Sequence, residues 1–313
     1  MSVKKIQEEV IKLKKETETT ILAHYYQPIE VQEVADYVGD SLGLSRLAKE
    51  ASSEYIIFAG VDFMAETASI LNQDKHVLIP NPESCCPMAA FLTPEMVKNF
   101  KRDYHNLPVV VYVNSTAAVK AESDVCCTSS NAVKIVKKIS SEFNTDAVLF
   151  GPDANLADYA EQISKIKTIK MPDKGHCYVH SQIKTEHILL SKKDHPNAKV
   201  LVHPECIREV RELSDIVGST SYMYNAVKNS SSTEKEFIIG TESGLMERMA
   251  QDFPDKKFYL VMNKLVCYNM KKNTIELLKY VLEHLDEKMF EVKVPSDIAK
   301  KALIPIERML EFS

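Results

Sequence analysis

The sequence lacks a long apolar run, an excess of basic residues and an N-terminal secretion signal. No stretch approaches the roughly 18–20 apolar residues needed to span a bilayer, so membrane association is not expected. The formal net charge of −5 gives no support for nucleic-acid binding, and a small anionic ligand would have to be held by local donors. The N-terminal segment reads as a charged amphipathic helix without the apolar core of a signal peptide, which predicts a cytoplasmic protein.

Cysteines are few and odd in number. Seven cysteines in a chain without a secretion signal argue against a disulfide framework and for reduced thiols, some of which could bind metal. Hydrophobic residues make up 45% of the chain and charged residues 27%, which is ordinary for a globular protein. A length of 313 residues is long for one core but suits three domains.

Three similar segments follow one another along the chain. The segments that begin at Ile21, Val109 and Lys199 share polar residues, glycines and a closing cysteine at matching positions. The residues in register are His24, Asn114 and His203; Asp36, Asp124 and Asp215; Ser41, Ser129 and Ser219; Gly60, Gly151 and Gly240; and Cys86, Cys177 and Cys267. Internal repeats predict architecture before any single motif does, and these indicate three units that could each deliver one thiolate to a common point.

Apolar strand-like runs alternate with amphipathic helical patterns within each segment, which is typical of parallel α/β sheets. We therefore predict the α/β class, with three similar domains that each contain a small parallel sheet flanked by helices. The expected domains are residues 1–91, 92–181 and 182–272, which end just after Cys86, Cys177 and Cys267. Residues 273–313 are expected to form a helical extension that packs back on the first repeat.

One cysteine closes each segment after its last strand. Loops beyond the carboxyl ends of parallel strands form the ligand crevice of α/β folds, so three such ends facing one axis would bring the thiolates together. Three soft thiolates suit an iron–sulfur cluster or zinc better than magnesium or calcium. A four-iron cluster with three protein ligands would keep one iron open as a Lewis acid. The alternative is that all three are buried structural cysteines.

The other four cysteines are interpreted as structural or incidental. The repeat register favours Cys86 over Cys85 by a single residue. Cys126 and Cys127 align with a turn position in the other copies, so a packing role is expected, and Cys206 has no repeat partner.

Polar residues follow the first strand of each segment. Tyr26, Thr116 and Glu205 occupy equivalent positions there, close after His24, Asn114 and His203. Each segment also places a hydroxyl at a helix start, where free N–H groups can bind carboxylate or phosphate; Ser41 is expected at an N-cap, and the others are Ser129, Ser219 and Thr220. Plain N-capping is the alternative. The remaining histidines, including His105 and His180, show no register and are mostly expected at the surface.

A set of motifs, taken together, resembles the quinolinate synthase family over nearly the whole chain. They are AHYYQPIEVQEVADYVGDS, CPMA, YVNSTAAVKAESD, CTSSNA, VHPEC, VGSTS, GTESG and CYNMKKNT. The resemblance implies three α/β domains around a pseudo-threefold axis, with a [4Fe-4S] cluster and the active site at the centre. It also implies condensation of iminoaspartate with dihydroxyacetone phosphate to quinolinate in NAD biosynthesis, with loss of phosphate and two waters. An enzyme that supplies iminoaspartate is an expected partner.

The resemblance further implies roles for individual residues. Cys86, Cys177 and Cys267 match the cluster ligands, while Cys85 stands where relatives often carry a small residue. Tyr26 and Glu205 match proton-transfer positions, with the two in-register histidines beside them. The candidate substrate-binding residues are His24, Ser41, Tyr112, Val113, Asn114, Ser129, His203, Pro204, Glu205, Ser219 and Thr220. Two competing hypotheses are another cluster-dependent hydro-lyase acting on a small dicarboxylate, and a non-catalytic redox sensor or zinc scaffold.

Overall fold

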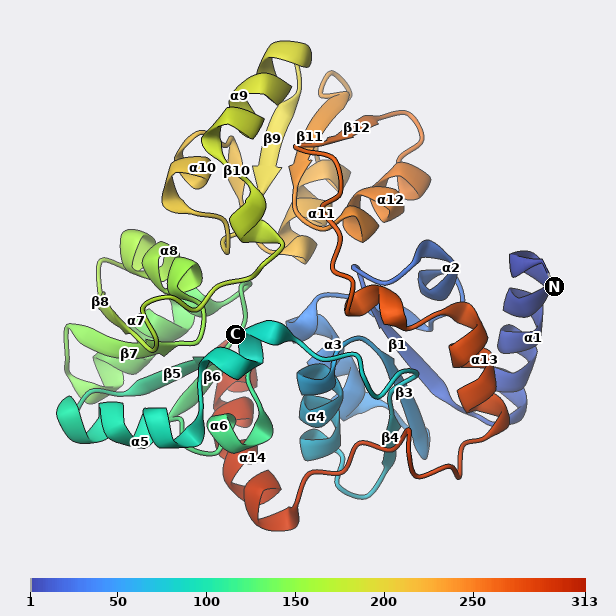
Figure 1. Cartoon of the computed structure of the whole chain (residues 1–313), viewed down its shortest axis with the longest axis horizontal. Helices are drawn as coiled ribbons and strands as arrows, with labels where there is room; N and C mark the ends of the chain where they lie inside the picture. The colour runs from blue at the N-terminus through green and yellow to red at the C-terminus, as the bar shows by residue number, and fades with distance from the viewer. Residues whose placement is uncertain (1) are drawn as a thin grey trace.

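Three four-stranded parallel sheets form the framework of the protein, seen in a computed structural model that describes residues 2–313. In every sheet the first strand of the unit lies between the second and the third, and the fourth strand forms an edge. Helices flank each sheet, and the three units lie around a common centre (Figure 1). The α/β class predicted from the repeats, with three similar parallel-sheet units, is confirmed.

The three units contain the same succession of elements. The first has α1 (Val3–Glu16), β1 (Thr20–His24), α2 (Ile29–Gln32), β2 (Tyr37–Gly39), α3 (Ser41–Glu50), β3 (Tyr55–Ala59), α4 (Asp62–Leu71), β4 (His76–Leu78) and the 3₁₀ helix η1 (Pro87–Phe91). The second has α5 (Pro94–Asp103), β5 (Val109–Tyr112), α6 (Ala117–Lys120), β6 (Val125–Cys127), α7 (Ala132–Phe143), β7 (Ala147–Gly151), α8 (Ala154–Ser164), β8 (Lys167–Lys170) and η2 (His180–Gln182). The third has α9 (Thr185–Asp194), β9 (Lys199–Val202), α10 (Arg208–Glu212), β10 (Ile216–Val217), α11 (Thr220–Lys228), β11 (Glu236–Gly240), α12 (Ser243–Asp252), β12 (Lys257–Leu260) and η3 (Met270–Lys272).

Apolar runs rich in valine and isoleucine form the central strands. All four residues of β5 are buried, as are four of the five residues of β1. Strands that are covered by helices on both faces require apolar residues on both faces, which explains the continuous runs in the sequence.

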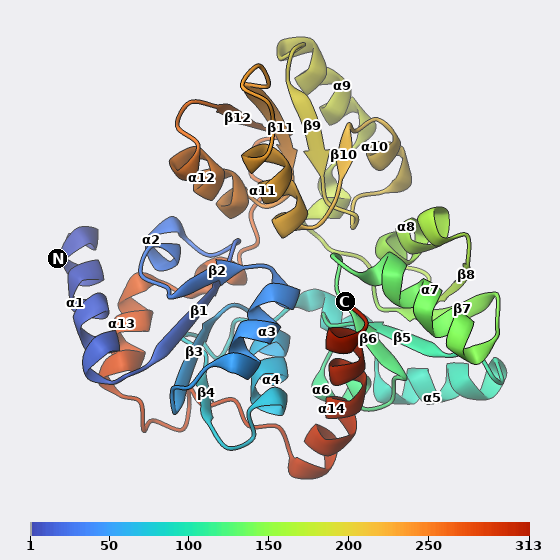
Figure 2. The same ribbon diagram turned by 180° about the vertical axis from the view of Figure 1, so that it is seen from behind.

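The C-terminal extension contacts two units. Helix α13 (Ile275–Glu283) packs against α1, where Ile6 and Val10 share an apolar cluster with Ile275 and Leu278. Helix α14 (Ser296–Glu311) lies against α6 and β6 of the second unit and also contacts α4 of the first (Figure 2). Within residues 2–313, no helix combines the length and the apolar character needed to cross a membrane.

The in-register aspartates have one structural role in all three units. The carboxylates of Asp36, Asp124 and Asp215 accept hydrogen bonds of 2.8, 2.7 and 2.7 Å from the backbone N–H of a residue near the start of the unit's first strand. Their own N–H groups donate to the carbonyl of that same strand residue. The pair of bonds fixes the second strand beside the first, which explains why this position repeats.

The segment after each of these aspartates was expected to be a turn, and this prediction is wrong. Residues 125–127 form strand β6, in which Cys126 pairs with Val111 and Cys127 with Tyr112. The matching segments form β2 and β10. Parallel pairing to the first strand satisfies backbone groups that a turn would leave without partners. Cys126 and Cys127 are fully buried in this packing, whereas Cys85 is exposed.

Candidate functional site

A single pocket at the centre of the molecule is lined by all three units. It collects the carboxyl ends of β1, β5 and β9, the starts of α3, α7 and α11, and the loops that follow β4, β8 and β12. Its lining residues are His24, Tyr26, Asp40, Ser41, Val61, Phe63, Cys86, Pro87, Met88, Tyr112, Asn114, Thr128, Ser129, Ser130, Cys177, Tyr178, Val179, His180, His203, Glu205, Thr220, Cys267 and Met270. This placement agrees with the general position of ligand sites in parallel α/β sheets.

Most of the site residues predicted from the sequence line this pocket. Val113, Pro204 and Ser219 are the exceptions, although all three are buried beside it. Val113 follows the last residue of β5 and packs in the same apolar cluster as Tyr112. Ser219 acts as the N-cap of α11, where its hydroxyl accepts a hydrogen bond of 3.3 Å from the N–H of Tyr222.

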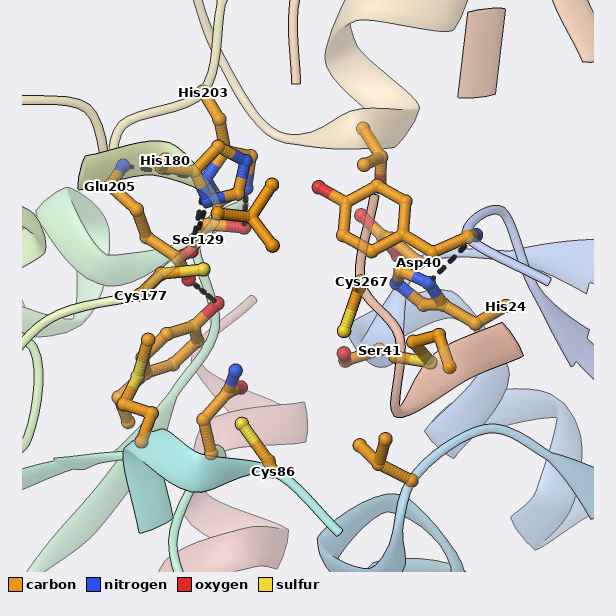
Figure 3. Close-up of a pocket in the computed structure, with 18 of the residues that line it drawn as sticks. His24, Asp40, Ser41, Cys86, Ser129, Cys177, His180, His203, Glu205 and Cys267 are labelled. Atoms are coloured by element: carbon orange, nitrogen blue, oxygen red, sulfur yellow. Dashed lines mark hydrogen bonds and ion pairs between the residues drawn. The ribbon is translucent and has the colours of Figure 1, made fainter. Parts of the chain in front are cut away.

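The three in-register cysteines face one another across the pocket. Each lies in the loop after a fourth strand and before a short 3₁₀ helix. Figure 3 shows the sulfur atoms of Cys86, Cys177 and Cys267 pointing toward a shared space. All three are free thiols of intermediate exposure. The Cys177 and Cys267 loops are also joined directly, because the hydroxyl of Tyr178 accepts a hydrogen bond of 2.9 Å from the N–H of Tyr268.

The electrostatics of these thiols favour a bound cation. Burial raises the pKa of the Cys86 thiol, and the neighbouring Cys267 raises this pKa further. Burial also raises the pKa of Cys177, with additional repulsion from Glu205 and Cys86. Three such thiolates repel one another unless a metal neutralises them, so this donor set fits a thiolate-bound metal group.

A second set of potential ligand atoms lies beside the cysteines. Cys177, His180 and Glu205 offer ligand atoms that all lie within 4.8 Å of one another. However, the carboxylate oxygens of Glu205 already accept bonds from Tyr112 and His180, and the second ring nitrogen of His180 is bonded to Thr241. We therefore interpret His180 and Glu205 as members of a hydrogen-bond network.

This network connects residues from all three units. The hydroxyl of Tyr112 donates to Glu205 Oε1 over 2.6 Å, and His180 Nδ1 lies 2.7 Å from Glu205 Oε2. His180 Nε2 lies 2.9 Å from the hydroxyl of Thr241, which lies 2.7 Å from the hydroxyl of Tyr26. An ionised carboxylate can only accept, so the proton of a neutral His180 resides on Nδ1 and Nε2 accepts from Thr241. The chain therefore runs from Tyr26 through Thr241 and His180 to Glu205.

The prediction of a surface location is wrong for His180, whose side chain is only 1% exposed. It lies in η2, three residues after Cys177, and the corresponding residue three positions after Cys267 is Met270. Both residues line the pocket. Their common spacing from a pocket cysteine could have indicated that His180 lies in the pocket. A search for identical residues in the repeats does not detect a histidine that aligns with a methionine.

Two buried histidines present neutral donors to the pocket. Nδ1 of His24 accepts a hydrogen bond from the N–H of Tyr26, and Nδ1 of His203 accepts one from the N–H of Glu205. Burial lowers the pKa of His24 to about 4 and that of His203 to about 3, so both are neutral at pH 7. Because Nδ1 accepts, the proton resides on Nε2. In His203 this atom lies 3.1 Å from the hydroxyl of Ser129.

One carboxylate joins the three helix starts around the pocket. Asp40 accepts from the N–H of Gly43 over 2.9 Å, so Asp40, and not Ser41 as expected, is the N-cap of α3. Its other oxygen accepts a bond of 2.5 Å from the hydroxyl of Ser130 and one of 3.5 Å from that of Ser219. The hydroxyl of Ser41 is therefore not needed for capping and lines the pocket.

Comparison with known proteins gives one consistent result. Residues 8–311 match the family model described as "Quinolinate synthetase A protein". The chain is 49% identical to the quinolinate synthase of Pyrococcus abyssi over 98% of this chain and 99% of the relative. It is 46% identical to that of Thermotoga maritima, over 97% and 98% of the two chains, and 45% identical to that of Thermococcus kodakarensis over the full length of both.

Proposed function

Because the chain belongs to the quinolinate synthase family, we propose that its central pocket condenses iminoaspartate with dihydroxyacetone phosphate, releasing quinolinate, phosphate and two waters. The function of the chain is quinolinate synthesis in NAD biosynthesis. The reaction is a transferase-type condensation followed by dehydration. The observation that supports it best is the convergence of three thiols, two neutral histidines and the Glu205 network in one pocket.

We propose a [4Fe-4S] cluster as the cofactor. Cys86, Cys177 and Cys267 would hold it, since they are the pocket cysteines, whereas Cys126, Cys127 and Cys206 are fully buried away from the lining. When bound, such a cluster has one iron without a protein ligand, which supplies Lewis-acid assistance to the loss of a hydroxyl group.

Several neutral donors in the pocket suit substrates that carry carboxylates and a phosphate. The Nε2–H groups of His24 and His203 and the hydroxyls of Ser41 and Thr220 can donate to these anionic oxygens. The side-chain oxygen of Asn114 is buried and has no hydrogen-bond partner among residues 2–313. A buried acceptor of this kind requires a donor, and an imine N–H or a substrate hydroxyl would provide one.

The Glu205 network can move protons between the two substrates. Burial alone would raise the pKa of Glu205, but the hydrogen bonds that its carboxylate accepts from His180 and Tyr112 outweigh burial and lower this pKa. Glu205 is thus ionised at neutral pH and can act as a general base. Burial raises the pKa of Tyr26 and that of Tyr112 well above the usual value, so both hydroxyls stay protonated as donors. A proton can pass between Tyr26 and Glu205 through Thr241 and His180.

The function is tested by anaerobic purification followed by a product assay. We expect about four irons and four sulfides per chain. Iminoaspartate, generated in the assay because it is unstable, should give quinolinate only together with dihydroxyacetone phosphate, detected by mass spectrometry. Colourless protein with a single zinc would overturn the cofactor. Cluster-loaded protein that makes no quinolinate from both precursors would overturn the reaction.

A further inference from the structure

An acidic residue follows the third strand at the same position in every unit. Asp62, Asp153 and Glu242 each stand two residues after the in-register glycine. Their carboxylates accept hydrogen bonds of 3.1, 3.1 and 3.2 Å from the backbone N–H of Cys86, Cys177 and Cys267, respectively. Each acid therefore holds the pocket cysteine of its own unit.

Each carboxylate also binds the start of the helix that follows the third strand. Asp62 accepts from the N–H of Phe63 over 2.8 Å, while Asp153 and Glu242 accept over 2.7 Å from Leu156 and Gly244, respectively. These helices are α4, α8 and α12. A backbone bond of 2.8 Å next to each acid further ties the cysteine loop to the helix start. Each cysteine loop is thus anchored to the helix start of its own unit.

Helix capping alone does not account for these three acids. A single hydroxyl satisfies a helix start, as Thr93 does for α5. The bond from the cysteine N–H is additional: Asp153 and Glu242 accept it with their second oxygen, and Asp62 accepts both bonds with Oδ1. The contact is maintained although Glu242 is one methylene longer than the two aspartates, and although the loop sequences ESCCPM, KGHCYV and KLVCYN share little besides the cysteine. In all three units, a carboxylate accepts a hydrogen bond from the backbone N–H of the pocket cysteine.

We infer that Asp62, Asp153 and Glu242 are positioning residues that fix the three cysteine backbones, so that the sulfurs stay directed at one metal group. The inference rests on the proposed cofactor and adds residues that do not touch it. Partners that orient metal ligands commonly change metal affinity by about 10–100-fold when they are removed. Asp153 and Glu242 are both fully buried, and Asp153 is used for the test below.

The test measures how fast iron is lost to a chelator from anaerobic, cluster-loaded protein. Asp153→Ala should lose iron at least about tenfold faster than the wild type. Asp153→Asn keeps one side-chain oxygen for the N–H groups of Leu156 and Cys177, and its NH2 group can only donate, so it should restore part of the retention. Asp124→Ala is the matched control, since Asp124 accepts a bond of the same kind, 2.7 Å from the N–H of Val109 in the same unit, and does not bond a pocket cysteine.

The control separates positioning from general stability. We expect both alanine variants to unfold at lower urea concentration than the wild type, with faster iron loss only in Asp153→Ala. If Asp153→Ala does not fold, Asp62→Ala tests the same bond at a less buried position. Equal iron loss from wild type and Asp153→Ala, or equally fast loss from Asp124→Ala, would overturn the inference while leaving the cofactor in place. Wild-type protein that holds no iron would overturn both.

Discussion

Tyr112, at the end of β5, donates a hydrogen bond of 2.6 Å to the carboxylate of Glu205, which follows β9 in the next unit and is 93 residues distant in sequence. The contact connects two units at the pocket and leaves Glu205 with one oxygen bound to Tyr112 and the other to His180. A carboxylate with this support is both ionised and fixed in orientation, as a general base requires.

Glu205→Gln should therefore lower turnover without removing the cofactor. The amide has nearly the same shape but cannot accept a proton, and loss of a general base typically costs 10²–10⁴-fold in rate, roughly the range expected here. Turnover is measured as quinolinate formed per loaded chain, with iron content determined in parallel. Tyr112→Phe, which removes only one donor, should cost less than Glu205→Gln. Unchanged turnover in Glu205→Gln would remove this residue from the proton-transfer role.

Cys86→Ala should abolish iron binding and activity while the protein stays folded. Its neighbour Cys85 is exposed and does not line the pocket, so Cys85→Ser is a control that differs by one position along the chain. Iron per chain and circular dichroism distinguish loss of the cofactor from loss of the fold. If Cys85→Ser loses iron and Cys86→Ala retains it, the ligand in the first unit has been assigned to the wrong residue.

The repeats in the sequence predicted the fold because they record what the three units share. Asp36 and its counterparts repeat because each fixes a strand, and the cysteines repeat because each faces the centre. The repeats do not predict contacts that only one unit makes. Thr241 aligns with Val61 and Pro152, so the repeats gave no indication that its hydroxyl links Tyr26 to His180. A reaction on unlike substrates needs such asymmetry, and only the assembled pocket reveals it.

Other contacts were missed because they depend on geometry between units. From the sequence, Ser41 is the expected N-cap of α3, but Asp40 is the N-cap, and its second oxygen reaches Ser130 and Ser219 in the other two units. The acids that follow the in-register glycines were detectable in principle, since their spacing is constant. Their partner is a backbone N–H, however, which leaves no mark on the sequence of the cysteine loop.

Asp40→Ala should weaken the contact between the units as well as the cap of α3. Loss of an N-cap costs about 1 kcal/mol, and the two serine hydroxyls would each lose a charged acceptor. We expect the free energy of unfolding to fall by about 2–3 kcal/mol. KM should rise, because Ser130, which lines the pocket, loses the acceptor that holds its hydroxyl. Urea titration and steady-state kinetics measure the two effects. Asp40→Asn, which can still cap α3, should recover most of the stability, and wild-type values in Asp40→Ala would contradict the proposed role.

The buried histidines should make stability sensitive to mild acid. Because burial lowers the pKa of His24 to about 4, the unfolded chain takes up a proton as pH falls below about 6.5, whereas the folded chain does not. Stability from this group is thus lost between pH 6.5 and 4, by roughly 2 kcal/mol from pH 7 to 5. Burial raises the pKa of Glu242 to about 7, so protonation of this group stabilises the folded protein as pH falls. The contribution of His24 is therefore measured as the difference in pH dependence of stability between the wild type and a His24 variant.

His24→Gln should therefore lose less stability than the wild type when cluster-free protein is moved from pH 7 to pH 5, by roughly 2 kcal/mol in urea titrations. His203→Gln should behave alike, because burial lowers the pKa of His203 to about 3. His105 is exposed, so His105→Gln should follow the wild-type pH dependence and serves as the control. An identical pH dependence in His24→Gln and wild type would mean that His24 gains its proton in the folded pocket as readily as in water, and the neutral Nε2–H donor assigned to it would be wrong.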